Sequence, residues 1–477
     1  MHRLAGVAVL LTLAGCTVGP KYKRPVLQPP DKYYTDTAPQ ATSIADLPWW
    51  ELFRDPVLRN LILEALKNNY DVNIAAARVE QARAQAGVAR SLYFPQIGYG
   101  AGVTTEKYPT PLIRNNTYYS YAASLSWEID LWGRIRKLNE QQRALFFASL
   151  EAQRGVWLSL VSDVAQAYFE LRALDASLTI ARQTGQSFQE SFDLFNKKLE
   201  GGAGSALETS RAEGALANVQ AQISDLERLI TAKENQISLL LGKNPGPIAR
   251  GVPLSAQYDP SEVPAGLPST LLERRPDVRQ AEQQLVAANA AVGVAKADFF
   301  PVLNLTGLLG GVSPQLSQLV DSGKLWSAGA GLTGPLFTGG RLKNQYKLTR
   351  AQRDEFERSY QQLLTQAFGE VSSALVSHQK LAHAITEEKR SVTAYQQAVH
   401  LANTRYDNGL SSYFEVLDAK LQLYPAENAL VQFDLQRKIA LVALYKALGG
   451  GWKLNDPDWI KSATAAVPGT VPTSTSP

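Results

Sequence analysis

The chain repeats its own sequence once, at an offset of about 206 residues. Matching motifs occur in the same order in both halves, which chance similarity does not produce. The matches are Gly87-Val88-Ala89 with Gly293-Val294-Ala295, Phe94-Pro95 with Phe300-Pro301, Gly133-Arg134 with Gly340-Arg341, Glu208 with Glu415, and Leu241-Gly242 with Leu448-Gly449. Tandem copies of one unit fold on one plan. We therefore expect repeat 1 over 63–272 and repeat 2 over 273–460, side by side around a common axis.

Two long segments without proline set the length of the main helices. No proline lies within 112–244 or within 336–424. Apolar residues there recur in steps of four and three, which predicts long helices with a coiled-coil seam at about 134–199 and 341–406. Each would be roughly 100 Å long at 1.5 Å per residue. Helices in ordinary globular domains are much shorter.

Turns rich in Gly and Asn follow both long helices. They lie at 200–204 and 407–410 and lead into shorter helices at 205–241 and 411–448. Since Gly and Asn are typical of tight turns, each repeat is expected to contain a helical hairpin.

Each repeat also opens with a helix that a Phe-Pro pair ends. The first covers 56–93, with a break near Asn69, and the second runs from Pro276 to Phe300-Pro301. Proline is favoured in the first turn of a helix and disfavours helix in the residue before it, which explains both limits.

The two short helices of a repeat, placed end to end, match one long helix in length. We therefore expect the loop over 243–272 and the segment from Gly449 onward to meet residues 46–61 in an irregular belt at mid-length. The tail over 461–477 consists mainly of Ala, Thr, Ser and Pro, which predicts disorder.

Apolar residues alternate with small or polar ones between the opening helix and the long helix of each repeat. In the clearest case, Tyr119, Tyr121, Ala123, Leu125, Trp127 and Ile129 occupy every second position. This period predicts strand hairpins at about 95–131 and 301–337. Strands of about 10 to 13 residues with aromatic residues suit a membrane barrel. Taken alone, they fit a soluble sheet with one face on a core equally well.

The N-terminus has the pattern of a lipoprotein signal. An apolar run over 4–13 follows His2 and Arg3 and is too short for a membrane-spanning helix of roughly 20 residues. Small residues then precede Cys16, as in the lipobox of bacterial lipoproteins. We expect residues 1–15 to be removed and Cys16 to carry a covalent lipid at the start of a segment over 16–62. The alternative is an ordinary signal peptide with an incidental cysteine.

Two hairpins supply too few strands to close a barrel. They give four strands, whereas the smallest single-chain outer-membrane barrels have about eight. An open sheet edge in lipid would leave backbone groups without hydrogen-bond partners. We therefore expect the chain to oligomerise. A dimer would supply eight strands and a filled interior, and a trimer would supply twelve strands around a lumen.

Composition and spacing argue against several function classes. A net charge of +4 gives no basic field for nucleic acid, and the single Cys excludes a disulfide within the chain. His378, His383 and His400 share one helix at spacings that do not form a metal-binding face, so we expect them on the surface or in the seam. No nucleophile with a nearby base stands out. We expect the chain to have no enzymatic activity, no metal site, and no cofactor besides the covalent lipid.

Several motifs taken together resemble the TolC-like outer membrane factors, especially the lipoprotein branch that serves resistance-nodulation-division (RND) efflux pumps. They are Leu13-Ala14-Gly15-Cys16 with 18–25, Trp49-Trp50, Phe53-Arg54-Asp55-Pro56, Arg274-Arg275-Pro276-Asp277-Val278, Phe299-Phe300-Pro301, Phe337-Thr338-Gly339-Gly340-Arg341 and Arg405-Tyr406 with Gly409. The resemblance extends from Cys16 to about Trp459. It implies a mainly α fold with a membrane β-barrel: a TolC-like trimer with a twelve-stranded β-barrel and an α-helical barrel, internally duplicated.

The resemblance also implies a function and partners. The chain would be a passive channel of a tripartite efflux system, lipid-anchored in the outer membrane of a Gram-negative bacterium and extending into the periplasm. A periplasmic adaptor and an inner-membrane pump of the RND type would deliver drugs or other small toxic compounds. Type I secretion and metal efflux are alternatives within this class. A structural or adaptor coiled-coil lipoprotein is the alternative of another class, but it would carry one hairpin and no duplicated strand pairs.

In channels of this family, a ring of carboxylates after the second turn narrows the periplasmic entrance. The matching positions are Glu415 and Asp418, which lie three residues apart on one helix face. In a trimer they would favour cations and raise one another's pKa values. The alternative is a pair of solvated helix carboxylates. Repeat 1 keeps Glu208 but has Arg211 where Asp418 would stand.

The turns are the expected docking points for the adaptor. The first lacks the Lys and Ser/Thr of a phosphate-binding loop. Some relatives carry a basic residue where Ser411 stands, so a charged latch at that position is in doubt, whereas Arg405 and Tyr406 are suited to bonding across helices. The tip residues expected to dock or latch are Gly201, Gly202, Gly204, Arg405, Tyr406, Asn408, Gly409 and Ser411.

Overall fold

The computed structural model describes residues 17–25, 33, 43–106, 116–260, 263–264, 266, 271–321 and 323–451. The predicted signal over 1–15, the lipid site at Cys16 and the predicted disordered tail over 461–477 lie outside these residues. The chain forms two units. Unit 1 contains Met1–Leu27, Ala77–Glu151 and Arg279–Gln362, and unit 2 contains Gln28–Ala76, Ala152–Val278 and Leu363–Pro477.

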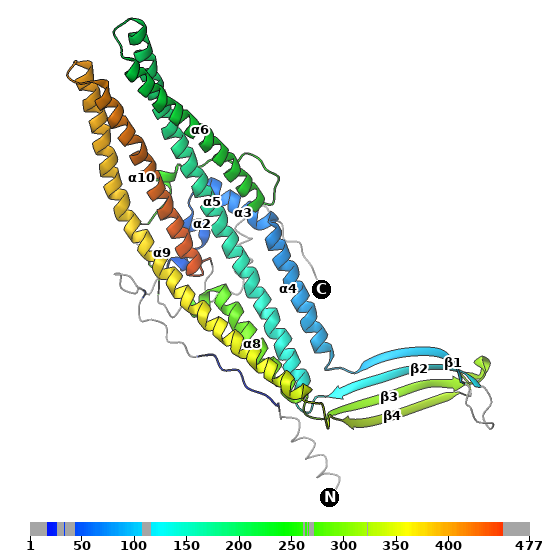
Figure 1. Cartoon of the computed structure of the whole chain (residues 1–477). Helices are drawn as coiled ribbons and strands as arrows, with labels where there is room; N and C mark the ends of the chain where they lie inside the picture. Colours follow the sequence, from blue (N-terminus) through cyan, green and yellow to red (C-terminus); the bar gives the residue numbers. More distant parts are fainter. Residues whose placement is uncertain are drawn as a thin grey trace. The chain divides into compact units, whose positions relative to one another are not determined.

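Unit 1 contains a four-stranded antiparallel sheet in the order β1-β2-β3-β4 (Figure 1). The strands are β1 (Gln96–Glu106), β2 (Asn116–Ile129), β3 (Val302–Ser313) and β4 (Lys324–Thr333). All four lie within the two predicted hairpin segments. The central pairing joins β2 of repeat 1 to β3 of repeat 2, so that β1 and β4 form the two edges of the sheet.

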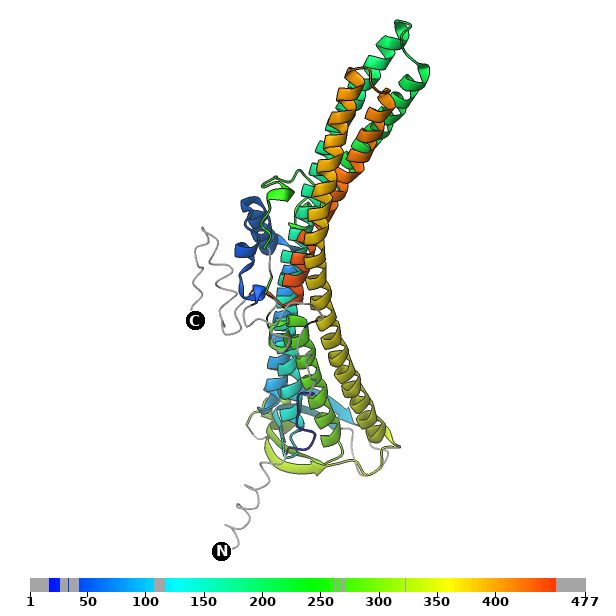
Figure 2. The ribbon, with the colours of Figure 1, turned by 90° about the vertical axis from the view of Figure 1, so that its left-hand side faces the viewer.

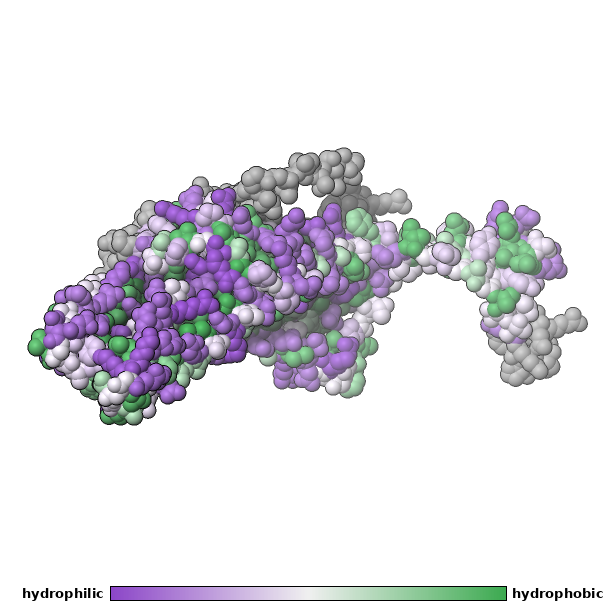
Figure 3. Space-filling model, turned by 90° about the horizontal axis from the view of Figure 1, so that it is seen from above, coloured by the Kyte–Doolittle hydropathy of each residue, from purple (hydrophilic) through white to green (hydrophobic). Residues whose placement is uncertain are grey.

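The register places the alternating apolar residues of all four strands on one face of the sheet. Leu125 of β2 pairs with Ile97 of β1, and Leu309 of β3 pairs with Trp326 of β4. Much of this face is uncovered in the single chain, because Tyr99 is 96% exposed and Trp326 76% exposed. Figure 3 shows hydrophobic residues on the surface of the sheet, at the right of the view. An apolar surface of this kind marks a contact with lipid or with another chain.

The two repeats contain helices of equal length. They are α4 (Tyr70–Ser91) and α8 (Pro276–Ala297) with 22 residues each, α5 (Arg134–Glu200) and α9 (Arg341–Asp407) with 67 each, and α6 (Ala206–Leu240) and α10 (Tyr413–Ala447) with 35 each. The long helices begin where predicted and end one residue later. Among the described residues, no helix combines the length and the apolar composition needed to cross a membrane.

Short elements complete the chain. They are η1 (Ile44–Asp46), α2 (Trp49–Leu52), α3 (Pro56–Asn68), η2 (Leu254–Ala256), α7 (Leu271–Arg274) and η4 (Leu316–Gln318). The predicted break at Asn69 separates α3 from α4. Its side-chain oxygen accepts hydrogen bonds from the backbone N–H of Asp71 at 2.8 Å and of Val72 at 3.3 Å. Asn69 therefore caps the start of α4.

The same joint occurs in both repeats within unit 2. In repeat 1 the Asn69 side chain donates to the carbonyl of Leu240 at 2.9 Å, and in repeat 2 Arg275 donates to the matching carbonyl of Ala447 at 3.1 Å. These bonds join the end of α6 to the start of α4, and the end of α10 to the start of α8. The short helices of each repeat thus meet end to end, as predicted.

A left-handed glycine closes each joint. Gly242 has φ +69° and Gly449 has φ +68°. A Cβ added at Gly242 would lie 2.5 Å from the carbonyl oxygen of Asn68, and one at Gly449 would lie 3.0 Å from that of Arg274. Only glycine fits such a conformation and such a close approach without strain.

Asp55 fixes the predicted belt in unit 2. Its carboxylate is 2% exposed, caps α3, and accepts hydrogen bonds from the Tyr168 hydroxyl at 2.8 Å, the Val252 N–H at 2.9 Å and the Gln257 amide at 2.7 Å. Burial is the largest single influence and raises the pKa of Asp55, but these hydrogen bonds outweigh it and leave the pKa below its ordinary value. Residues 46–61 and the loop over 243–272 therefore meet, as predicted.

A second carboxylate, that of Asp259, is 11% exposed and joins the belt to the helices. Asp259 lies 2.9 Å from His378 Nε2 of α9, and 2.9 Å from Arg437 and 3.3 Å from Lys438 of α10. Burial raises the pKa of Asp259, but the hydrogen bond from His378 and the two cations outweigh it and lower the pKa. His378 was expected on the surface or in the seam, and the structure buries it against this carboxylate.

The N-terminal segment over 17–25 lies along α8 in unit 1. The Val18 N–H donates to the carbonyl of Trp132 at 3.0 Å, and the Asn289 side chain donates to the carbonyl of Pro20 at 3.1 Å. Further along, Arg24 Nε donates to Glu282 at 2.7 Å. The segment therefore starts beside the residues that follow β2 and continues along α8.

Candidate functional site

The tips of the two helical hairpins in unit 2 hold most of the predicted site residues. Gly202 and Gly409 take left-handed conformations, with φ +74° and +68°. The following N–H groups bond back to the ends of the long helices, Ala203 to Lys198 at 2.9 Å and Leu410 to Arg405 at 2.8 Å. This is the usual glycine-based end of a helix. The predicted turns are therefore present in both repeats.

Position 204 requires glycine because the backbone of α5 approaches it closely. A Cβ added there would lie 2.6 Å from the backbone nitrogen of Leu199. The next residue, Ser205, caps α6 by accepting a hydrogen bond from the Leu207 N–H at 3.3 Å. Gly204 thus lets the chain reverse within a few residues, and Ser205 starts the returning helix.

Aromatic side chains pack the two hairpins together near their tips, where the hairpins lie side by side (Figure 2). The ring of Tyr413 lies 4.4 Å from that of Phe195 and 5.4 Å from that of Tyr406, measured between centroids. The hydroxyl of Tyr413 is hydrogen-bonded to Ser191. Burial raises the pKa of Tyr413, so the hydroxyl stays protonated at neutral pH. This contact crosses from α10 to α5.

A polar link joins the hairpins at the same level. Lys198 Nζ of α5 donates to the hydroxyl of Tyr406 of α9 at 2.6 Å and lies 5.0 Å from the centre of its ring. Arg405, the neighbour of Tyr406, instead bonds within its own hairpin, with its Nε 3.1 Å from Glu415 of α10. Both predicted latch residues thus bond across helices, one between hairpins and one within a hairpin.

The two predicted gate carboxylates differ in their surroundings. Glu415 forms an ion pair with Arg405, and both side chains are about half exposed, at 47% for Glu415 and 53% for Arg405. Asp418 is exposed, and among the described residues no cationic group lies within 4 Å of it. An exposed ion pair contributes only about 0.2–1 kcal/mol, so Glu415 is readily released. Of the two predicted gate residues, Asp418 is therefore the one that has no ion-pair partner among the described residues.

The remaining tip residues form an exposed surface with apolar side chains. Leu410 is 69% exposed, Leu207 59% and Phe414 54%. Asn408 is exposed and donates to a backbone carbonyl one turn earlier. The hydroxyl of Ser411 is buried and has no hydrogen-bond partner in the described part of the chain. Uncovered apolar groups at both turns are typical of a surface that binds another protein.

The sequence did not point to Ser191, Lys198 or Tyr413 as tip residues. The one available signal was the pair Phe188 and Phe195, which are seven residues apart and therefore face the same way along a coiled-coil seam. Both are almost fully buried between the hairpins. In the described residues, no three His, Cys, Asp or Glu side chains are placed to hold a metal ion.

The family model described as "Outer membrane efflux protein" matches residues 61–243 and 267–450, one match in each repeat. The chain belongs to this family. The predicted family is therefore confirmed, and the two matched segments agree with the predicted duplication.

Similar proteins cover nearly the whole chain. The solvent efflux pump outer membrane protein SrpC of Pseudomonas putida is 36% identical over 459 residues, which is 94% of this chain and 97% of SrpC. The probable outer membrane lipoprotein SilC of Salmonella typhimurium is 32% identical over 459 residues, 94% of this chain and 99% of SilC. The open state of the MtrE outer membrane channel of Neisseria gonorrhoeae superposes with a TM-score of 0.85 at 30% identity, covering 92% of this chain and 99% of MtrE.

These likenesses confirm the predicted fold class, location and general function. The chain has the fold of TolC-like outer-membrane channels, is located in the outer membrane, and serves efflux. The match over both repeats also favours a channel over a structural or adaptor coiled-coil lipoprotein.

Proposed function

We propose that this chain is the outer-membrane channel of a tripartite efflux system and that it works as a homotrimer. The observation that carries the proposal is the sheet of unit 1, which has two unpaired edge strands, β1 and β4, and an uncovered apolar face. In lipid each unpaired backbone group costs several kcal/mol. Pairing β4 of one copy with β1 of the next removes this cost.

Three copies fit best. Three sheets of four strands give twelve strands, which leave a lumen, whereas eight strands are filled by their own side chains. The alternation on the strands supports this arrangement, because the face opposite the apolar one carries mostly small and polar residues, such as Ser124, Thr306 and Gly329. Such a face suits a water-filled interior.

Glu415 and Asp418 form the proposed periplasmic gate. They lie on one face of α10 beside the second tip, and in a trimer they would bring six carboxyl groups near one axis. Carboxylate rings favour cations and narrow an entrance. Because Glu415 is paired with Arg405 in the single chain, Asp418 contributes more of the negative electrostatic potential at the entrance.

Conductance in planar bilayers tests the channel. We expect the wild-type trimer to open rarely and to prefer cations, and the double variant Glu415→Gln, Asp418→Asn to conduct more and to lose most of that preference. Glu208→Gln is the matched control, since it removes a carboxylate at the corresponding place in repeat 1. No conductance from a folded trimer, even with both gate residues replaced, would contradict the channel.

Cys16 is the proposed lipid site. It directly precedes Thr17, and the next residue, Val18, is held at Trp132, just after the end of β2. A lipid on Cys16 would therefore start near the ends of the membrane strands. We expect Cys16→Ser to lose labelled palmitate and to keep its trimer. Palmitate that remained on the variant would contradict the assignment.

A periplasmic adaptor is the proposed partner at the tips, and an inner-membrane pump of the RND type is the proposed source of substrate. The exposed Leu207, Leu410 and Phe414 support an apolar contact there. Small toxic compounds are the proposed cargo, supported by the naming of SrpC for solvents. We expect Leu207→Asp with Leu410→Asp to abolish adaptor pull-down while conductance persists. Unchanged pull-down would remove the tips as the docking site.

A further inference from the structure

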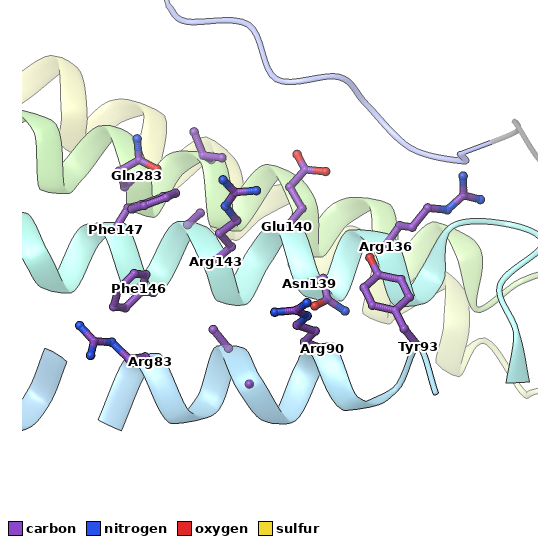
Figure 4. A pocket seen from close by; sticks show the side chains of 14 residues that line it. Arg83, Arg90, Tyr93, Arg136, Asn139, Glu140, Arg143, Phe146, Phe147 and Gln283 are labelled. Carbon is purple, nitrogen blue, oxygen red and sulfur yellow. The ribbon is translucent and has the colours of Figure 1, made fainter. Parts of the chain in front are cut away.

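A pocket lined by arginine and aromatic side chains lies on α4, α5 and α8 in unit 1 (Figure 4). It includes Arg83 and Arg90 of α4 and Arg136, Arg143, Phe146 and Phe147 of α5. In Figure 4, Arg83 and Arg90 extend from α4 toward α5, and Phe146 extends from α5 toward α4. Neither the tips nor the proposed gate uses these residues.

The pocket carries an excess of positive charge. Its one carboxylate, Glu140, is paired with Lys137 at 2.6 Å. Two of its arginines are paired, Arg83 with Glu80 and Arg136 with Asp130, each at 3.1 Å. In the described part of the chain, Arg90 and Arg143 form no ion pair and supply the excess charge. The guanidinium of Arg143 lies 5.4 Å from the ring centre of Phe147, which holds it at the pocket without neutralising it. Such a site attracts an anion.

The second repeat shows what can cover this kind of surface. Helices α4 and α8 match residue for residue, with Tyr70 at the place of Pro276 and Gly87 at the place of Gly293. On α8 the N-terminal segment crosses so closely that a Cβ added at Gly19 would lie 2.6 Å from Gly293 Cα. On α4, no atom of the part of the chain that the structure describes lies within 4 Å of a Cβ added at Gly87. The described residues therefore leave the corresponding surface of repeat 1 uncovered at Gly87.

The charges of the two surfaces show that their occupants differ. The N-terminal segment is basic, and its Arg24 binds Glu282 of α8 at 2.7 Å. Where α8 has Glu282 and Asn289, α4 has Ala76 and Arg83. The N-terminal segment of a second copy would therefore lose its acidic anchor and meet arginine. The surface of repeat 1 therefore favours binding of a negatively charged group.

The pocket lies next to the ends of the membrane strands. The Trp127 indole of β2 donates to the carbonyl of Tyr93, a pocket residue, at 3.1 Å, and Arg136 pairs with Asp130, just beyond β2, at 3.1 Å. Exposed apolar side chains stand beside it, with Phe94 59% exposed. Basic and aromatic groups together at this level are typical of proteins that contact lipid headgroups.

We propose that this pocket binds the phosphate headgroup of an anionic phospholipid in the periplasmic leaflet of the outer membrane. The inference rests on the membrane position of the sheet and goes beyond the channel function. Arginine suits the role because its planar guanidinium donates two parallel hydrogen bonds to a phosphate. The aromatic side chains contact the adjoining glycerol and acyl groups.

Binding of short-chain phosphatidylglycerol to the purified trimer in an uncharged detergent tests the proposal. We expect saturable binding to wild type and at least 10-fold weaker binding to the variant Arg83→Gln, Arg90→Gln, Arg143→Gln. The matched control is Lys343→Gln, Lys347→Gln, Arg350→Gln, which removes the same charge from exposed positions of α9 and should change the affinity less than twofold. Glu140→Gln, which removes no arginine, should tighten binding severalfold.

Other outcomes would overturn the proposal. Equal weakening by the control would show a general charge effect, and equal binding of phosphatidylcholine would show that the headgroup charge is irrelevant. Inorganic phosphate that competed at the same concentration would show an anion site without lipid selectivity. The arginine variant should keep its trimer and its conductance, so a failure of the channel itself is recognised separately. If that variant does not assemble, unchanged affinity in Glu140→Gln contradicts the site.

Discussion

Repeat 1 and repeat 2 share their backbone plan but differ in charge at corresponding positions. Both place a left-handed glycine, Gly242 or Gly449, at the end of the returning helix. Both bond the start of the opening helix to the same carbonyl position, through Asn69 in one repeat and Arg275 in the other. The duplicated chain has thus kept the residues that fix the backbone.

Where the repeats face different surroundings, their side chains differ. At the tips, Asp418 of repeat 2 corresponds to Arg211 of repeat 1. In the belt, His378 of α9 meets Asp259, whereas the corresponding residue of α5 is Leu171, which is fully buried in the apolar core. Local charge therefore changed after duplication while the backbone geometry was kept, so the two can be perturbed separately.

The joint glycines should give the largest effect. Gly242→Ala forces a left-handed alanine, at about 1–2 kcal/mol, and adds a contact of 2.5 Å to Asn68, so we expect a total loss of about 3 kcal/mol. Gly449→Ala, with its nearest contact at 3.0 Å, should lose about 2 kcal/mol. Gly214→Ala, in the open interior of α6, should be neutral or slightly stabilising. Urea unfolding of the solubilised protein measures all three. An unchanged midpoint for Gly242→Ala would contradict the shared joint.

Replacing the two polar residues of the joint, Arg275 and Asn69, should lower the free energy of unfolding by different amounts. Arg275→Met removes ion pairs with Asp277 and Glu370, both at 2.6 Å, and should lose about 2–3 kcal/mol. Asn69→Ala removes a helix cap and one hydrogen bond, and should lose about 1–2 kcal/mol. The same unfolding measurement ranks them. A larger loss for Asn69→Ala would show that the cap, and not the buried cation, dominates the joint.

The belt should respond to pH through Asp259, which lies in the loop of repeat 1 and pairs with α9 and α10 of repeat 2. Because the folded protein lowers the pKa of Asp259, its contribution is fully present above the ordinary carboxyl pKa of about 3.9 and is lost as pH falls through the lower, folded value. Asp259→Asn should therefore be less stable than wild type by about 1–2 kcal/mol at pH 7. We expect this difference to shrink below about pH 4. A stability difference that grew on acidification would contradict a lowered pKa for Asp259.

The smallest change in stability is expected at the second tip. Arg405→Gln removes an exposed ion pair and should alter stability by less than about 1 kcal/mol. It should nevertheless increase the cation preference of the channel, because the positive charge of Arg405 no longer offsets the negative charge of Glu415. The reversal potential in a salt gradient measures this preference. A weaker cation preference would argue against Glu415 at the entrance.

The backbone plan could be read from the sequence because local residues determine it. Phe94-Pro95 and Phe300-Pro301 end the opening helices, glycines mark both turns, and absence of proline permits the two 67-residue helices. The period of two located all four strands. Because each pattern occurs in both repeats, every helix and strand assigned in one repeat is supported by its counterpart in the other.

The contacts between distant residues could not be read in this way. Lys198 meets Tyr406, and Asp259 meets His378, only because helices far apart in sequence pack together. The spacing of Glu415 and Asp418 predicted a shared helix face, but not that Arg405 lies opposite the first of them. Local patterns carry no information about such partners, which depend on how the hairpins pack.

Native mass spectrometry of the folded protein in detergent shows whether other copies complete the two free edges of the sheet. We expect a single species with three times the mass of the mature chain and its lipid, stable until the detergent is exchanged for a denaturing one. A folded species containing one copy, with β1 and β4 still unpaired, would contradict the shared barrel.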